Sequence, residues 1–148
     1  MFEQECVPFA PALIESMRSL GYSFPAAIAD LIDNSISAHA SNINIYSDPG
    51  IDPFLIILDD GTGMNSKKIY EAMRYGSTNP LEERSKDDLG RFGLGLKSAS
   101  LSQCRKFIVV SKQNDEINAL SWDLDYVINS QAWMLKGYSE NEIAEFYD

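Results

Sequence analysis

The stretch FLIILDDGTGM, residues 54–64, joins an apolar run to an acidic turn that contains two glycines. The apolar part predicts a strand of the kind that is buried on both faces. Asp59 at its end can accept a hydrogen bond from an exocyclic amine, while Gly61 and Gly63 let a flat ring approach the backbone. An acidic turn without a ligand is an equally good interpretation of these residues. A ribose-binding acid of a dinucleotide fold is disfavoured, because no G-x-G-x-x-G opens a helix upstream.

Upstream, the segment ADLIDNS, residues 29–35, lies within a predicted helix over residues 25–40. Asp30 and Asn34 are four residues apart, so a helix places them on one face, where a carboxylate and an amide can hold a water and Mg²⁺. An exposed polar face on an amphipathic helix is the alternative interpretation. The apolar residues around the motif favour the functional one, because they predict a well-buried helix.

Downstream, the segment LGRFGLGLKS, residues 89–98, places three glycines before a predicted helix that runs to about residue 104. Such glycines leave free backbone N–H groups facing an anion, and Lys97 and Ser98 in the first turn add donors. Phosphate is therefore the expected ligand. The segment is not a P-loop, because that motif needs glycine directly before the lysine, where this chain has Leu96. A glycine-rich hinge without a ligand is the alternative.

The rest of the sequence predicts a single domain over residues 1–148, without internal repeats or a linker. Its other predicted elements follow from hydrophobic periodicity and turn residues. They are helices over residues 12–20 and 67–73, strands over residues 42–47, 106–111 and 119–124, and a short last helix opened by a capping box of Ser139 and Glu142.

The composition excludes several classes of function. The chain has 148 residues, of which 45% are apolar, and 12 basic against 22 acidic side chains give a net charge of −10. This charge repels nucleic acid and anionic membranes. No apolar run reaches the roughly 20 residues of a membrane span, and the first ten residues do not resemble a signal peptide. We therefore expect a cytoplasmic protein without membrane or direct nucleic-acid contacts. Cys6 and Cys104 are expected to be free thiols.

Taken together, the three motifs, in this order and at these gaps, resemble the ATP-binding domain of the GHKL superfamily, which groups gyrase B, the large heat-shock chaperone, histidine kinases and MutL. The resemblance extends over about residues 13–125 and is closest to the MutL, MORC and heat-shock-chaperone branches. It implies a Bergerat-type fold, which is a two-layer α/β sandwich. Its mixed, largely antiparallel sheet has helices on one face, and ATP lies between helices and sheet.

The resemblance also implies a role for each motif residue. Asn34 would carry the Mg²⁺ that bridges the phosphates, and Asp59 would bind the adenine amine, partly through water. Asp30 would be the catalytic base, at a position where ATPases of these branches carry a glutamate, which is one methylene longer. A displacement on the order of 1 Å can cost roughly 100-fold in rate, so slow hydrolysis, or ATP binding without turnover, is expected. The other cofactor-binding residues would be Asp33, Gly61, Gly63 and Met64 around adenine, and Gly90, Gly93, Leu94, Gly95, Leu96, Lys97 and Ser98 around the triphosphate.

The implied function is Mg²⁺-dependent binding of ATP and ADP with weak ATPase activity, in a nucleotide-gated conformational or dimerisation switch. Residues 65–89 would form the lid over ATP, and its closure would favour an ATP-dependent homodimer. The chain lacks the late Gly-Thr strand and the transducer-domain lysine of the superfamily, so we expect further domains in the same polypeptide. One alternative is a kinase of the histidine-kinase type, which would need asparagine at position 30. Another is a non-catalytic interaction module with a degenerate pocket, disfavoured by the retained Asn34, Asp59 and glycines.

Overall fold

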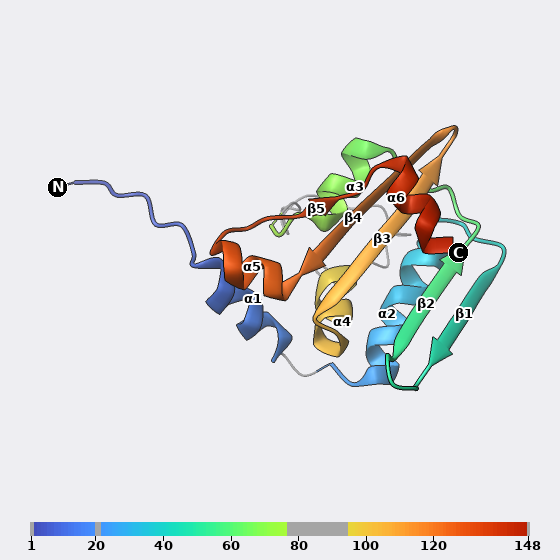
Figure 1. Cartoon of the computed structure of the whole chain (residues 1–148), viewed down its shortest axis with the longest axis horizontal. Helices are drawn as coiled ribbons and strands as arrows, with labels where there is room; N and C mark the ends of the chain where they lie inside the picture. Colours follow the sequence, from blue (N-terminus) through green and yellow to red (C-terminus); the bar gives the residue numbers. More distant parts are fainter. Residues whose placement is uncertain (1, 20–21, 77–94, 148) are drawn as a thin grey trace.

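The computed structural model describes residues 2–19, 22–76 and 95–147 (Figure 1). Each predicted helix and strand in these ranges is present and ends within about three residues of its predicted bounds. The helices are α1 (Ala10–Arg18), α2 (Phe24–Ser37), α3 (Ser66–Met73), α4 (Gly95–Gln103), α5 (Leu124–Ser130) and α6 (Glu140–Ala144), and the strands are β1 (Ile43–Asp48), β2 (Phe54–Asp59), β3 (Lys106–Gln113), β4 (Glu116–Asp123) and β5 (Lys136–Gly137).

The described strands form two antiparallel sheets. β1 pairs with β2 from Ile43 opposite Asp59 to Asp48 opposite Phe54. β3 pairs with β4 along its whole length, and the two residues of β5 pair with the other edge of β4. Helices α2, α3 and α4 lie on one side of the strands (Figure 1). The predicted α/β sandwich with helices on one face is therefore confirmed, and every described strand pair is antiparallel.

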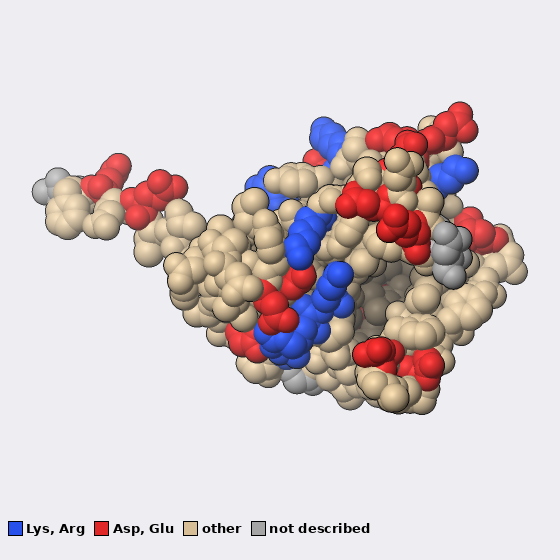
Figure 2. Space-filling model, viewed as in Figure 1, with Lys and Arg blue, Asp and Glu red and all other residues tan. Residues whose placement is uncertain are grey.

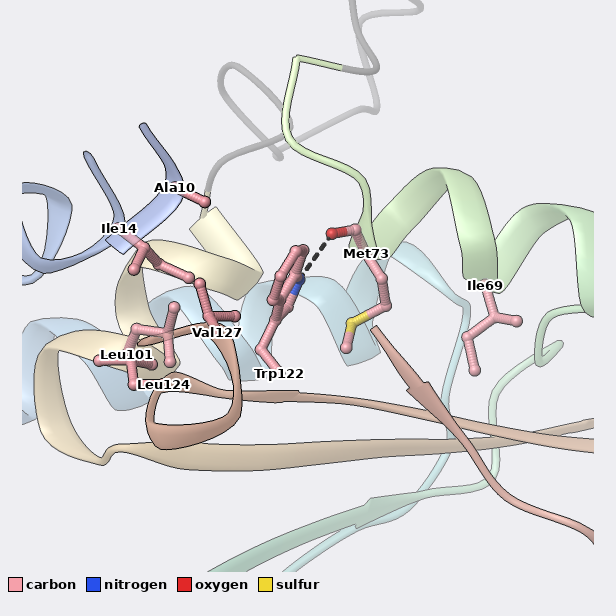
Figure 3. Packing of buried hydrophobic residues seen from close by; sticks show 8 residues of the cluster. All are labelled: Ala10, Ile14, Ile69, Met73, Leu101, Trp122, Leu124 and Val127. Atoms are coloured by element: carbon pink, nitrogen blue, oxygen red, sulfur yellow. Dashed lines mark hydrogen bonds between the residues drawn. The ribbon is translucent and has the colours of Figure 1, made fainter. Parts of the chain in front are cut away.

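The hydrophobic core lies between the β3–β4 pair and helices α1, α3, α4 and α5 (Figure 3). Trp122 occupies its middle, and its Nε1 atom donates a 2.8 Å hydrogen bond to the Met73 carbonyl oxygen. The rings of Tyr75 and Trp133 pack on it, with centroids 5.4 and 6.0 Å from the Trp122 ring. The fully buried members are Ala10, Ile14, Ile69, Met73, Leu101, Trp122, Leu124 and Val127.

β2 is exposed on one face, so the prediction of a strand buried on both faces is wrong. Phe54, Ile56 and Leu58 keep 50%, 51% and 48% of their surface. They alternate with Asp59 along the strand and therefore point away from α2, together with Tyr46 of β1. The reason is tertiary: α2 covers the inner face, and the outer face has no cover among the described elements. We call Tyr46, Phe54, Ile56 and Leu58 the outer apolar face.

Helix α2 begins at a Ser23 cap, whose hydroxyl accepts a hydrogen bond from the Ala26 N–H group. It ends in a Schellman motif, where His39 adopts a left-handed φ of 59° and the Ala40 N–H group bonds back to the Ser35 carbonyl oxygen. The helix is less buried than its apolar pattern predicts, since Ile36 is 49% exposed. Its inner face is what the site uses.

Two smaller predictions are confirmed. The capping box of Ser139 and Glu142 opens α6. Cys6 and Cys104 are free thiols, and burial raises the pKa of Cys104. In the described part of the chain, no helix is both long and apolar enough for a membrane span.

Candidate functional site

The three sequence motifs meet around α2. The first motif is part of this helix, the second follows β2, and the third opens α4, and α2 packs against both β2 and α4 (Figure 1). At the α4 side, a methyl group on Gly95 would lie 3.8 Å from Asp30 Oδ2. Residues separated by more than 60 positions are therefore neighbours here, as the motif order predicts for one site.

The turn after β2 is tied to the C-terminal half of α2. Ser35 is 3% exposed, and its hydroxyl group donates a 2.8 Å hydrogen bond to Asp59 Oδ2. The other carboxylate oxygen of Asp59 accepts a 2.9 Å hydrogen bond from the Gly61 N–H group. The Thr62 N–H group in turn donates to the Ala38 carbonyl oxygen over 2.9 Å. Asp59 is therefore held in one orientation at the strand end, with its side chain still exposed.

Both glycines of this turn are required by contacts within the protein. A methyl group on Gly61 would lie 2.8 Å from the Ala38 side chain, too close for two carbon atoms. Gly63 has a left-handed φ of 65°, and a methyl group there would overlap the Lys112 carbonyl oxygen. The sequence interpretation gave these glycines the task of leaving room for a ring. The geometry adds a second one, which is close packing on α2 and β3.

The end of the turn is fastened to β3. The Met64 N–H group donates a 2.8 Å hydrogen bond to Ser111 Oγ, and Gln113 Nε2 donates a 3.2 Å hydrogen bond to the Gly63 carbonyl oxygen. The turn thus bridges the two sheets from α2 to β3. This bridge gives the predicted adenine-side residues a rigid frame.

Asp30 has a partner that the sequence did not reveal. The Tyr22 hydroxyl group donates a 2.7 Å hydrogen bond to Asp30 Oδ2. This bond, together with partial burial and the nearby negative charge, raises the pKa of Tyr22 above its ordinary value. One oxygen of the predicted base is therefore already engaged, and the other accepts no hydrogen bond from the described residues.

The remaining acidic and amide groups divide into two kinds. Asn34 is exposed and Asp33 is half-buried on α2. Asp60 is structural, because its carboxylate accepts hydrogen bonds of 2.7 and 2.8 Å from the backbone N–H groups of Ser41 and Asn42. The side-chain and backbone bonds from Asn42 also lower the pKa of Asp60. Of the described residues, no three His, Cys, Asp or Glu side chains form a group that could hold a metal ion alone.

Lys97 lies in the first turn of α4, but its side chain is buried in the protein, whereas the sequence suggested a donor to phosphate. It is 1% exposed, and its Nζ atom donates a 2.6 Å hydrogen bond to the Ala72 carbonyl oxygen at the end of α3. Burial lowers the pKa of Lys97 to about 8. Gly95 and Leu96 are half-buried, and Ser98 is 8% exposed.

Part of the predicted site and lid falls outside the described residues. This holds for Gly90, Gly93 and Leu94 of the third motif and for residues 77–89 of the predicted lid. The first part of that lid is α3, whose Ile69 and Met73 belong to the core. The beginning of the predicted lid is therefore a packed helix.

Sequence reasoning missed two polar residues that hold the site together. Ser35 follows Leu31 by four positions, so it lies on the apolar stripe of α2, and a hydroxyl group there needs a buried partner. That signal was available. The sequence held no such signal for Tyr22. This residue lies before the helix begins, so helical spacing does not relate it to Asp30, and their contact is visible only in the structure.

Comparison with known proteins gives concordant matches. A family model described as histidine kinase-, DNA gyrase B-, and HSP90-like ATPase matches residues 22–148. ATPase MORC2B of Mus musculus is 33% identical over 98 residues, 64% of this chain and 10% of its own length. ATPase morc-1 of Caenorhabditis elegans is 33% identical over 96 residues, 64% of this chain and 11% of its own length.

A bacterial protein is similar over the same share of the chain. The DNA mismatch repair protein MutL of Rickettsia bellii (strain OSU 85-389) is 29% identical over 97 residues, which is 64% of this chain and 16% of its own length. The matched region therefore spans less than a fifth of each of these relatives.

Proposed function

This chain belongs to the histidine kinase-, DNA gyrase B- and HSP90-like (GHKL) ATPase family, and on that premise we propose that it binds Mg²⁺ and ATP at α2, the 59–64 turn and the start of α4. The observation that carries the proposal is the junction of the three motifs, held by the Ser35–Asp59 hydrogen bond on one side of α2 and by the approach of Gly95 to Asp30 on the other. A site for base, metal and phosphates needs all three together.

The adenine end of the proposed site is the 59–64 turn. Asp59 is exposed, and an ionised carboxylate has about four lone-pair positions, so two bound donors leave capacity for an exocyclic amine. Met64 is half-buried beside the turn and offers an apolar contact to a ring, and Asp33 is half-buried on the facing helix. Gly61 and Gly63 add no side chains of their own to the turn.

The phosphate end is the start of α4 together with Asn34. Backbone N–H groups over residues 95–98 open a nine-residue helix, which is a general anion site. The carboxamide oxygen of Asn34 is a hard ligand of the kind that Mg²⁺ takes, and Mg²⁺ commonly binds through one or two protein ligands with waters and substrate phosphates. A single Asn34 ligand therefore fits the chemistry. Gly90, Gly93 and Leu94 are included at the phosphate end because the resemblance to the superfamily places them around the triphosphate.

Hydrolysis would be slow in this scheme, with Asp30 as the base that activates water. Its carboxylate lies on the same face of α2 as Asn34 and next to the phosphate end. Its hydrogen bond from Tyr22 orients one oxygen. The short side chain places the other oxygen further from phosphate than a glutamate would, and this distance is the expected cause of weak turnover.

We further propose that residues 1–148 form one ATP-binding domain within a longer polypeptide and act as a nucleotide-gated conformational or dimerisation switch. The supporting fact is that the matched region covers less than a fifth of each of these relatives. Light scattering with and without a non-hydrolysable ATP analogue tests the dimer. An unchanged monomer mass in both would count against it.

Calorimetric titration with Mg·ATP and Mg·ADP tests nucleotide binding directly. The variants are wild type, Asp59→Asn and, as a matched control, Asp52→Asn in the exposed β1–β2 turn. Asp59→Asn should weaken binding at least about tenfold, since it loses a charge-assisted acceptor, and Asp52→Asn should leave it unchanged. Removal of Mg²⁺ with a chelator should also weaken binding. Absence of binding at millimolar nucleotide would replace this proposal with that of a non-catalytic interaction module.

A further inference from the structure

Lys97 is a buried cation in the first turn of α4, directed away from the surface. It is 1% exposed, its Nζ atom donates a 2.6 Å hydrogen bond to the Ala72 carbonyl oxygen, and the same atom lies 5.6 Å from the centroid of the Tyr75 ring. A buried ammonium group costs free energy unless it is well paired. We therefore expect the charge of Lys97 to have a role that an apolar side chain of equal length could not fill.

The contact of Lys97 closes the end of a neighbouring helix. The last carbonyl groups of α3 have no partner within that helix. Two side chains from other elements supply donors, because Lys97 binds the Ala72 oxygen and Trp122 Nε1 binds the Met73 oxygen over 2.8 Å. A cation at this end also interacts favourably with the helix dipole. The first turn of α4 is thereby fixed to α3, while Gly95, two residues earlier, lies beside Asp30 of α2.

We propose that Lys97 is a positioning residue for the nucleotide phosphates: its buried ammonium group fixes the first turn of α4 and adds positive charge behind the phosphate-binding N–H groups, without touching phosphate. This inference rests on the proposed function of the site. It replaces the expectation from sequence that the Lys97 side chain donates to phosphate directly. In a buried environment a charge is little screened by solvent, so it acts over the short distance to the helix start.

The protonation of Lys97 supplies a readout. Burial lowers its pKa to about 8 from an ordinary value of 10.5. Three groups face Lys97 or its helix. They are Tyr75 just after α3, which burial keeps neutral by raising its pKa, Asp30 from α2, and Arg18 from α1, whose Nε donates to the Leu101 oxygen at the far end of α4. Raising the pH from 7 to 9.5 therefore removes the Lys97 charge and should weaken ATP binding.

The free energy of unfolding should move in the opposite direction. Because the folded pKa of Lys97 lies below its unfolded pKa, the unfolded chain binds more protons between pH 8 and 10.5, so this group's contribution to stability rises with pH in that window. A purely structural role would weaken binding and stability together. If ATP affinity falls with pH while the free energy of unfolding rises, the Lys97 charge strengthens ligand binding and destabilises the fold.

The experiment compares wild type, Lys97→Met and the matched control Lys67→Met, which removes an exposed charge from α3. Affinity for Mg·ATP is measured by calorimetry at pH 7 and 9.5, and hydrogen exchange over residues 70–76 is measured without nucleotide. Lys97→Met should bind about tenfold more weakly at pH 7, show no further loss at pH 9.5, and exchange faster over residues 70–76. Lys67→Met should behave as wild type in all three measurements.

Wild-type affinity and exchange in Lys97→Met at pH 7 would overturn the inference. Should Lys97→Met fail to fold, the wild-type pH profile decides, because equal affinity at pH 7 and 9.5 contradicts a role for the charge. Absence of any ATP binding by wild type at pH 7 would overturn the proposed function itself. In that case the exchange data would still show whether Lys97 holds the end of α3.

Discussion

The hydroxyl group of Ser35 donates a 2.8 Å hydrogen bond to Asp59 Oδ2, which joins the middle of the candidate site across 24 residues of sequence. Ser35 is buried, whereas Asp59 is exposed at the strand end. The buried hydroxyl group of Ser35 needs this acceptor because it has no access to water. The bond in turn fixes the orientation of the Asp59 carboxylate, which remains accessible to a ligand.

Ser35→Ala should destabilise the protein and weaken nucleotide binding. A hydrogen bond to a charged group contributes about 1.5 to 3 kcal/mol, and water can replace part of it at an exposed carboxylate, so a loss of about 1 to 2 kcal/mol is expected. Ser37→Ala on the same helix is the control, because Ser37 Oγ is buried without a hydrogen-bond partner among the described residues. Urea unfolding measures the stability of both variants, and calorimetric titration measures their nucleotide binding. An equal effect of the two variants would contradict the role of Ser35.

Gly63→Ala should cost far more stability than Gly76→Ala. The two glycines have nearly the same left-handed φ, 65° and 69°, so both variants incur strain of about 1 to 2 kcal/mol. At Gly63 the new methyl group overlaps the Lys112 carbonyl oxygen, whereas at Gly76 no atom of the described residues lies within 4 Å of it. Overpacking should add about 1 to 3 kcal/mol. Equal midpoints in urea would show that the turn and β3 separate freely.

Asp30→Asn should abolish hydrolysis while leaving ATP affinity close to that of wild type. A general base contributes about 10² to 10⁴ in rate, and an amide cannot accept the proton. Asp30→Glu should raise the rate, because it restores the length that ATPases of the related branches carry. Single-turnover hydrolysis at saturating Mg·ATP measures both. A wild-type rate in Asp30→Asn would remove Asp30 from the mechanism.

The stability of the C-terminal region should depend on pH in the acidic range. Lys136 donates a 2.8 Å hydrogen bond to Asp123 Oδ2, and this bond is the main cause that lowers the pKa of Asp123 from 3.8. A lowered carboxyl pKa adds stability above 3.8 that is lost as the pH falls through the folded value. Wild type should therefore unfold at higher temperature than Asp123→Asn at pH 6, and the gap should close as the pH falls below 3.8 through the lowered pKa of Asp123.

The control for this pair is Asp125→Asn. Asp125 binds Arg105 over 2.6 Å but keeps 68% of its side chain exposed, so water screens the pair. Its gap to wild type at pH 6 should be smaller than that of Asp123→Asn. Asp123 also caps α5, because its Oδ1 atom accepts a hydrogen bond from the Tyr126 N–H group. A constant gap from pH 6 to pH 3 for Asp123→Asn would assign the effect to this cap rather than to the charge.

Much of the fold was predictable because its signals are local. Apolar runs, glycine breaks and the Ser139 cap lie within a few residues of the elements they define, and the predicted elements are present. Helix α5 was missed because only Leu124 and Val127 mark its buried face, and β5 was missed because two residues carry no periodicity.

What could not be predicted depends on distant partners. The apolar run of β2 has the same letters whether one face or two are covered, and only the packing of α2 decides between them. The direction of Lys97 likewise depends on the end of α3, 25 positions away, and that of Asp30 on Tyr22. The motifs located the candidate site, whereas the contacts that hold its residues were visible only in three dimensions.

The outer apolar face also sets how this chain behaves in concentrated solution. It spans β1 and β2, each of which has one edge without a strand partner in the described part of the chain. An apolar strand with an open edge is a template for intermolecular pairing. Repulsion from the net charge of −10 opposes such encounters at low ionic strength. Added salt should therefore promote precipitation of the isolated domain well before it unfolds.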